Sequence, residues 1–81
     1  MKPYVVTVEN PNPSPTKLGV WASKYAVYAG SKAQAEGAVK YYTKAREATG
    51  EWVGPNLDFE KYSTYFAEAK ESRRPVFIEE V

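Results

Sequence analysis

Few side chains in this sequence belong to the types that catalyse reactions or bind metal ions. The 81 residues include no histidine and no cysteine, so the usual general base, the thiol nucleophile, the Ser–His pair and ordinary zinc sites are excluded. The one aspartate, Asp58, precedes a predicted helix, where capping explains it. Glu79 and Glu80 are adjacent in a predicted strand, so they point to opposite faces and cannot act as a pair. We therefore expect no catalytic residue, no metal site and no cofactor, and we expect that the protein is not an enzyme.

Gly30, Ser31 and Lys32 lie where a predicted strand passes into a predicted helix. Backbone amides at such a helix start can hold a phosphate or a sulfate. The phosphate-binding pattern Gly-x-x-x-x-Gly-Lys-Ser/Thr is absent, however. We expect that Gly30 makes a turn and that Ser31 caps the helix, and we keep a small anionic ligand at these three residues as the weaker alternative.

The segment 24–46 holds four of the seven tyrosines and five of the eleven basic residues. A groove for single-stranded nucleic acid needs several aromatic rings on the same exposed face as the cations. A helical wheel places only Tyr41 beside Lys40 and Lys44, and two glutamates interrupt that face. Nucleic-acid binding through these three residues and Lys32 is therefore a disfavoured alternative.

The charges are divided unevenly along the chain, with a net charge of +5 in residues 1–46 and −4 in residues 47–81. A dedicated nucleic-acid binder is usually basic throughout, whereas opposite charges suit a protein partner with complementary patches. Trp52, in a predicted loop, is either an anchor for a partner, since tryptophan is enriched at interfaces, or a cover for the small core. We expect a protein partner to contact Lys40, Tyr41, Lys44 and Trp52.

Alternating apolar, aromatic or β-branched residues predict strands at 4–9, 24–30 and 76–81. Ser31 begins the first predicted helix, and Gly50 provides a left-handed stop after it. The apolar stripe of this helix consists of Ala35, Ala38, Val39, Tyr42 and Ala45.

The second helix is predicted to begin at Asp58, with Leu57 packing ahead of it, and to end before Pro75. Residues 51–56 before it are a predicted loop, and its apolar stripe consists of Phe59, Tyr62, Phe66 and Ala69. We expect a single domain, 1–81, with the order strand, strand, helix, helix, strand. The predicted fold is α+β, a three-stranded sheet with both helices packed on one face.

The last predicted strand, 76–81, is expected at an edge of the sheet. Pro75 opens it, and a proline is tolerated best where its missing amide donor is not needed, while Glu79 and Glu80 indicate that the strand's end is solvated. Because an edge can pair with another chain, a homodimer or strand addition to a partner is one expectation. The alternative is that the glutamates guard the edge against such pairing.

Membrane and compartment signals are also weak in this sequence. No apolar run approaches the ~20 residues of a membrane span, and residues 1–9 have a strand pattern rather than that of a signal peptide. The absence of cysteine fits the cytoplasm. We expect a cytoplasmic protein that does not contact a membrane.

The stretch "VYAGSKAQAEGAVKYY" combines a strand that ends in small residues, a serine cap and an alanine-rich helix. In this layout, in chain length and in its lack of catalytic residues, the chain resembles small phage-encoded inhibitors, which include anti-CRISPR proteins and inhibitors of host enzymes. The likeness covers roughly residues 25–49. It implies a stoichiometric role as an inhibitor or adaptor that acts on a host protein complex, and it carries over no particular residue.

Overall fold

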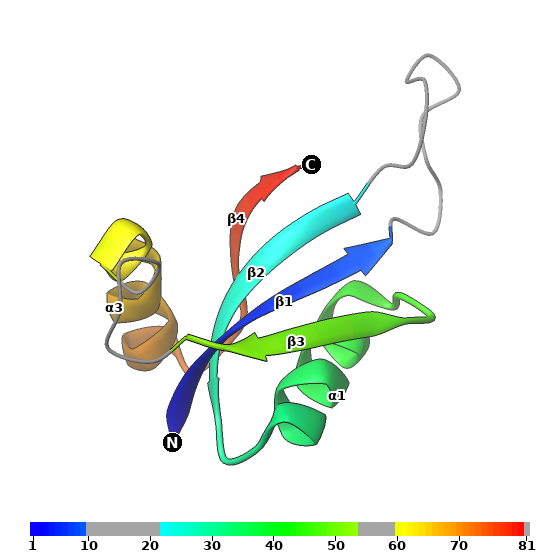
Figure 1. The fold of residues 1–81 in the computed structure, drawn as a ribbon, viewed down its shortest axis with the longest axis horizontal. Helices are drawn as coiled ribbons and strands as arrows, with labels where there is room; N and C mark the ends of the chain where they lie inside the picture. Colours follow the sequence, from blue (N-terminus) through cyan, green and yellow to red (C-terminus); the bar gives the residue numbers. More distant parts are fainter. Residues whose placement is uncertain (10–21, 54–59, 81) are drawn as a thin grey trace.

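The structure, a computed structural model, describes residues 1–9, 22–53 and 60–80. Its strands form one antiparallel sheet in the order β3-β1-β2-β4 (Figure 1). In chain order the elements are β1 (Lys2–Glu9), β2 (Ala22–Ala29), α1 (Lys32–Thr43), β3 (Ala48–Trp52), α3 (Ser63–Ser72) and β4 (Val76–Glu80). The proline-rich loop and the predicted roles of Leu57, Asp58 and Phe59 lie outside the described residues.

The prediction of an α+β fold is confirmed, but the predicted number and order of strands are wrong. Residues 48–52 form β3, which pairs antiparallel with β1 and places Gly50 opposite Val6. We had expected helix up to Gly50 and loop after it. Helix α1 instead ends at Thr43, because Lys44 adopts the left-handed conformation with φ 62°. The sequence of β3 has little strand character of its own, so pairing with β1 supplies the stability of this strand.

The two helices lie on opposite faces of the sheet, which corrects the prediction that both cover one face. Tyr4, Val6 and Val8 of β1 point toward α1, whereas Val5 of the same strand packs with the cluster under α3. Figure 1 shows the helices well apart, with the strands between them. The physical reason is that both faces of β1 and β2 carry apolar side chains, and each face needs its own cover. We refer to the two sides as the α1 face and the α3 face.

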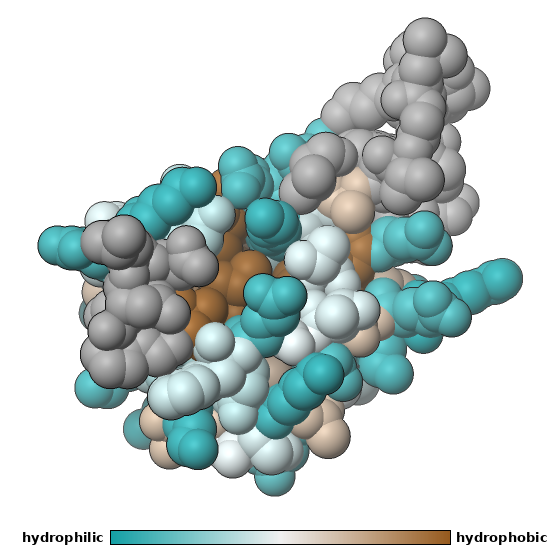
Figure 2. All heavy atoms as spheres, in the orientation of Figure 1, coloured by the Kyte–Doolittle hydropathy of each residue, from teal (hydrophilic) through white to brown (hydrophobic). Residues whose placement is uncertain are grey.

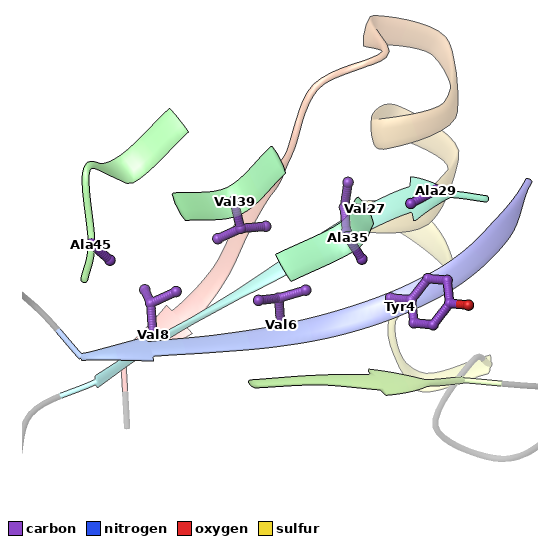
Figure 3. Packing of buried hydrophobic residues seen from close by; sticks show 8 residues of the cluster. All are labelled: Tyr4, Val6, Val8, Val27, Ala29, Ala35, Val39 and Ala45. Carbon is purple, nitrogen blue, oxygen red and sulfur yellow. The ribbon is translucent and has the colours of Figure 1, made fainter. Parts of the chain in front are cut away.

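The larger of two buried clusters lies on the α1 face (Figure 3). Helix α1 contributes Ala35 and Val39, both with no exposed surface. Two other residues of its predicted stripe are not buried: Ala38 is exposed and Tyr42 is half-exposed. Small side chains let the helix approach the strands closely, so the cluster is thin. Its members are Tyr4, Val6, Val8, Val27, Ala29, Ala35, Val39 and Ala45.

The second cluster lies on the α3 face and is built around Phe66, the largest fully buried side chain. The ring of Tyr28 in β2 meets that of Phe66 edge-on, with 5.9 Å between ring centroids. The described members of the predicted stripe of α3 are all buried, as predicted: Tyr62, Phe66 and Ala69. On the face drawn in Figure 2, the largest area of hydrophobic surface lies in a hollow, and hydrophilic side chains lie along part of its edge.

Strand β4 is an edge strand, as predicted, but it does not alternate evenly. Its pairing with β2 shifts register by one residue at Lys24 and Tyr25, so that Phe77 lies opposite Tyr25 and Glu79 lies opposite Lys24. Because paired residues share a face, Phe77 and Glu80 lie on the α1 face, and Ile78 and Glu79 lie together on the α3 face. This bulge corrects the even alternation that the sequence predicts for 76–81, which would place Glu79 on the same face as Phe77.

Neither helix of the described ranges has the length and apolar character needed to cross a bilayer.

Candidate protein interface

Three aromatic rings from three different elements meet on the α1 face, over the β2–β4 side of the sheet. Tyr25 of β2 packs edge-on against Tyr42 of α1, with ring centroids 6.3 Å apart, and against Phe77 of β4, with centroids 5.8 Å apart. Edge-to-face contacts at these separations favour the rings beyond the surface that they bury. We call Tyr25, Tyr42 and Phe77 the aromatic patch.

The patch is open to solvent because α1 lies over β3, β1 and β2. Tyr42 keeps 52% of its surface exposed and Phe77 keeps 47%. Large rings held in place by other rings, yet half-exposed, are typical of anchor residues at protein interfaces, since little conformational entropy is lost when a partner covers them.

The electrostatic environment of the patch favours a neutral Tyr25. Partial burial raises the pKa of the Tyr25 phenol above its ordinary value of 10.0, and the nearby charges of Tyr42 and Glu80 raise that pKa further. Glu80 lies on the same face because the bulge in β4 turns it there. The neutral Tyr25 hydroxyl can donate a hydrogen bond within the patch.

A groove of about 350 Å³ continues from the patch around the start of β4 toward α3. Tyr42 and Phe77 form one wall, while Tyr65, Glu68 and Arg74 are among the residues that line the remainder. The hydroxyl of Ser72, which also lines this groove, is buried and has no hydrogen-bond partner among the described residues. The groove therefore combines rings, both signs of charge and an unused polar group.

The predicted contact residues Lys40, Tyr41 and Lys44 do not belong to the aromatic patch. Lys40 and Tyr41 lie on the solvent side of α1, with Tyr41 90% exposed, and Lys44 follows the helix in its left-handed cap. Tyr41 projects from the helix about 100° away from Tyr42. All three residues are exposed, and their contact with a protein partner stays a prediction.

Trp52 lies at the other side of the sheet, at the end of the edge strand β3. It is 58% exposed, and the Nζ atom of Lys2 lies 5.6 Å from the centre of its ring. More than half of the Trp52 surface is exposed, which favours the anchor over the alternative that this side chain covers the core. Trp52 lies on the edge strand β3, and Phe77 of the aromatic patch lies on the opposite edge strand β4, so one small contact surface does not include both.

At the start of α1, two backbone amides that could contribute to an anion site, those of Gly30 and Gln34, already donate to side chains. The Ser31 hydroxyl accepts from the amide of Gln34 at 3.2 Å, and the amide of Gly30 donates to Oε1 of Gln34 at 3.0 Å. Ser31 is therefore the helix cap, as predicted, and Gln34 closes the turn in the manner of a capping box. Lys32 is exposed beside this turn. In the described ranges no group of three or more acidic, histidine or cysteine side chains is placed to hold a metal ion.

The sequence did not indicate the aromatic patch. Tyr42 was assigned to the buried stripe of its helix, and alternation alone could not show that α1 stops short of β4. Two aromatic residues in separate predicted strands, Tyr25 and Phe77, were the available signal, and only strand pairing makes them neighbours. Comparison of the chain with known protein families, curated proteins and solved structures finds no match.

Proposed function

We propose that this protein is a small binding protein that docks on a larger protein through the aromatic patch. The observation that carries the proposal is the contact of Tyr25 with Tyr42 and Phe77, which holds two half-exposed rings rigidly above the sheet. A partner that covers the rings with aliphatic or aromatic side chains removes apolar surface from water. It can also accept hydrogen bonds from the hydroxyls of Tyr25 and Tyr42.

The activity that we propose is stoichiometric blocking or bridging of the partner. With neither histidine nor cysteine in the sequence, binding explains the available chemistry more simply than catalysis does. The narrower form of the proposal, an inhibitor of the kind that phages encode acting on a host complex, rests on the layout of residues 25–49 and on no contact in the structure.

A paired set of variants tests this proposal. The double variant Tyr42→Ala/Phe77→Ala removes the exposed rings, and the control Tyr41→Ala/Trp52→Ala removes rings that lie elsewhere on the surface. A partner is first isolated with the tagged wild-type protein and then purified for titration calorimetry. The expected result is one-to-one binding that weakens by more than about tenfold in the patch variant. Equal affinity of the patch variant and the wild type would contradict the proposal. Loss of partner binding in the control variant alone would also contradict it.

A second candidate, nucleic-acid binding, is favoured by one observation: Tyr41 is almost fully exposed on α1, the helix that carries Lys40 and is followed by Lys44. A ring next to cations can stack on a base while the cations meet phosphates. Binding of a labelled single-stranded oligonucleotide should then fall steeply as salt rises. Tyr41→Ala should weaken it, and Tyr42→Ala/Phe77→Ala should not. Absence of binding at low salt ends this candidate.

A further inference from the structure

A second groove lies between the end of β2 and the last turn of α3, with a volume of about 560 Å³. Its floor is apolar and its rim is cationic, and no carboxylate is among the residues that line it. We call it the basic groove. Its lining residues are Met1, Val27, Tyr28, Ala69, Lys70, Arg73 and Arg74.

One side of the groove is an incomplete sheet edge. Strand β4 pairs with β2 only as far as Ala26, which lies opposite Val76, whereas β2 continues to Ala29. Over Val27–Ala29 the backbone of β2 therefore pairs with β1 on one side, and among the described residues it has no strand on the other. Amide and carbonyl groups at such an edge can accept a further strand.

The cations of the rim have no ion-pair partner in the part of the chain that the structure describes. Lys70, Arg73 and Arg74 are all exposed, whereas Lys24 lies 4.0 Å from Glu79 in an ion pair elsewhere on the sheet. Arg73 also occupies a left-handed backbone position with φ 57°, where glycine would be less strained. Residues held in strained backbone conformations often belong to functional sites.

We propose that the basic groove binds an acidic, extended peptide segment of another protein. The backbone of this segment continues the sheet beside Val27–Ala29, and its carboxylates meet Lys70, Arg73 and Arg74. The proposal goes beyond the aromatic patch, because it concerns a second groove with a different ligand chemistry, although Arg74 lines both grooves. It accounts together for the open strand edge, the apolar floor and the cations without carboxylate partners.

Other anionic ligands fit the groove less well. Tyr28 is the one ring of the lining residues, and it packs against Phe66 at 5.9 Å, so no platform for stacking bases is present among them. A bilayer surface needs apolar side chains that project outward. Here Met1 is the one strongly exposed apolar side chain of the lining residues, and Val27 and Ala69 are buried, so too little apolar surface projects outward to enter a bilayer.

The experiment measures the fluorescence polarisation of a short labelled peptide of alternating glutamate and valine, titrated with the full chain. We expect saturable binding that weakens as salt rises. Two altered peptides test the two halves of the proposal. One replaces every glutamate by glutamine, and the other carries N-methyl groups on the backbone amides that would pair with β2. Each should bind at least about tenfold more weakly.

Matched protein variants locate the site. Arg73→Gly/Arg74→Gln removes two cations from the rim, and the control Lys32→Gln/Lys40→Gln removes two from α1. The rim variant should bind about tenfold more weakly, as the loss of two exposed ion pairs implies, and the control should match the wild type. Melting curves must show that the rim variant is folded. Glycine at residue 73 relieves the strained backbone there and so favours the folded state.

Several outcomes would overturn the proposal. If the rim and control variants bound the acidic peptide equally weakly, binding would depend only on the net charge of the protein. Undiminished binding of the N-methylated peptide would remove the sheet edge from the site. Rim-dependent binding of a single-stranded oligonucleotide or of anionic lipid vesicles, with none of the acidic peptide, would replace the peptide by another class of ligand. Loss of stability in the rim variant with unchanged binding would show that the cations serve only the carbonyls at the end of α3.

Discussion

Glu36 and Gly50 form a contact between helix α1 and strand β3 that involves one side chain and one backbone amide. The amide of Gly50 donates to Oε2 of Glu36 at 2.7 Å, in a partly buried position. A Cβ atom added at Gly50 would lie 3.2 Å from Cγ of Glu36. The absence of a side chain at residue 50 therefore lets the helix lie close to the strand and lets the Glu36 carboxylate reach the backbone of β3.

Replacing Glu36 tests this contact. Hydrogen bonds to charged groups contribute roughly 1.5–3 kcal/mol when both partners are buried, so Glu36→Ala at this partly buried site should lower the free energy of unfolding by about 1–2 kcal/mol. Glu36→Gln keeps an acceptor and should cost less. Chemical denaturation of both variants provides the measurement, with Glu47→Ala as an exposed control. Equal stability of the Glu36→Ala variant and the control would mean that the contact contributes nothing.

The raised pKa of Tyr25 predicts a dependence of stability on pH in the alkaline range. Burial is the main cause of this raised pKa, followed by the charges of Tyr42 and Glu80, so the folded state holds the phenolic proton more tightly than the unfolded state does. The stabilising contribution is complete below about pH 10, the ordinary pKa of tyrosine, and is lost as the pH rises through the pKa of the folded state. When the pH is raised from below to above 10, the denaturation midpoint should fall less in Tyr25→Phe than in the wild type. If the midpoints of both proteins changed equally with pH, ionisation of the Tyr25 phenol would not be linked to folding.

Both helices end in the same unusual way, with a basic residue in the left-handed conformation. Lys44 follows α1 with φ 62°, and Arg73 follows α3 with φ 57°. The amide of Arg73 donates to the carbonyl of Ala69 at 2.9 Å, which closes the last turn. Glycine or asparagine usually occupies such a position, because other side chains are strained there.

Glycine at either helix end should therefore stabilise the protein. Lys44→Gly and Arg73→Gly should each raise the free energy of unfolding by about 0.5–1 kcal/mol, through relief of the strained backbone. Lys44→Ala and Arg73→Ala remove the same charges without relief and serve as controls. Urea denaturation compares the four variants. A glycine variant no more stable than its alanine counterpart would show that these residues are not strained.

The elements also show why the two edges of the sheet differ. Strand β3 pairs evenly with β1, whereas β4 has a bulge and ends in Glu79 and Glu80. Glu79 lies 4.0 Å from Lys24 and accepts a hydrogen bond from the Tyr62 hydroxyl at 3.3 Å. A bulge and charges are features that natural sheets use to avoid pairing with other chains. Pairing of β4 in a homodimer stays a prediction, and this arrangement favours the guarding role.

In the molecule as a whole, one sheet separates two thin layers of core. Val39 belongs to the layer under α1 and Phe66 to the layer under α3, and both are fully buried. A chain of this size has a total stability of roughly 4–12 kcal/mol. Each layer therefore accounts for a large share of the stability, and neither can be lost.

Phe66→Ala should leave the protein close to unfolding. Emptying a buried phenylalanine site costs about 3–5 kcal/mol, which approaches the expected total. Val39→Ala should cost about 2 kcal/mol by the same reasoning, and Tyr41→Ala, at an exposed site, should change stability by less than about 0.5 kcal/mol. Thermal unfolding followed by circular dichroism should show one transition for each variant. Two separate transitions in either core variant would show that the layers fold independently.

The local features of this fold could be predicted from the sequence. Alternation placed β1, β2 and β4, and a period of 3.6 residues identified Tyr62, Phe66 and Ala69 as the buried side of α3. Ser31 was identified as a helix cap, because its hydroxyl needs only an amide a few residues along the chain. Each of these predictions depends on residues near one another in the sequence, where propensity and periodicity operate.

The tertiary structure alone decided the features on which the proposed sites depend. Strand β3 exists because β1 offers it a partner, and the bulge in β4 brings Phe77 opposite Tyr25. The aromatic patch is open because α1 lies over β3, β1 and β2. The basic groove exists because β4 pairs with β2 only as far as Ala26. All of these join residues that are distant in the chain, and the energies that select them come from pairing and burial across the sheet, which a local pattern does not contain.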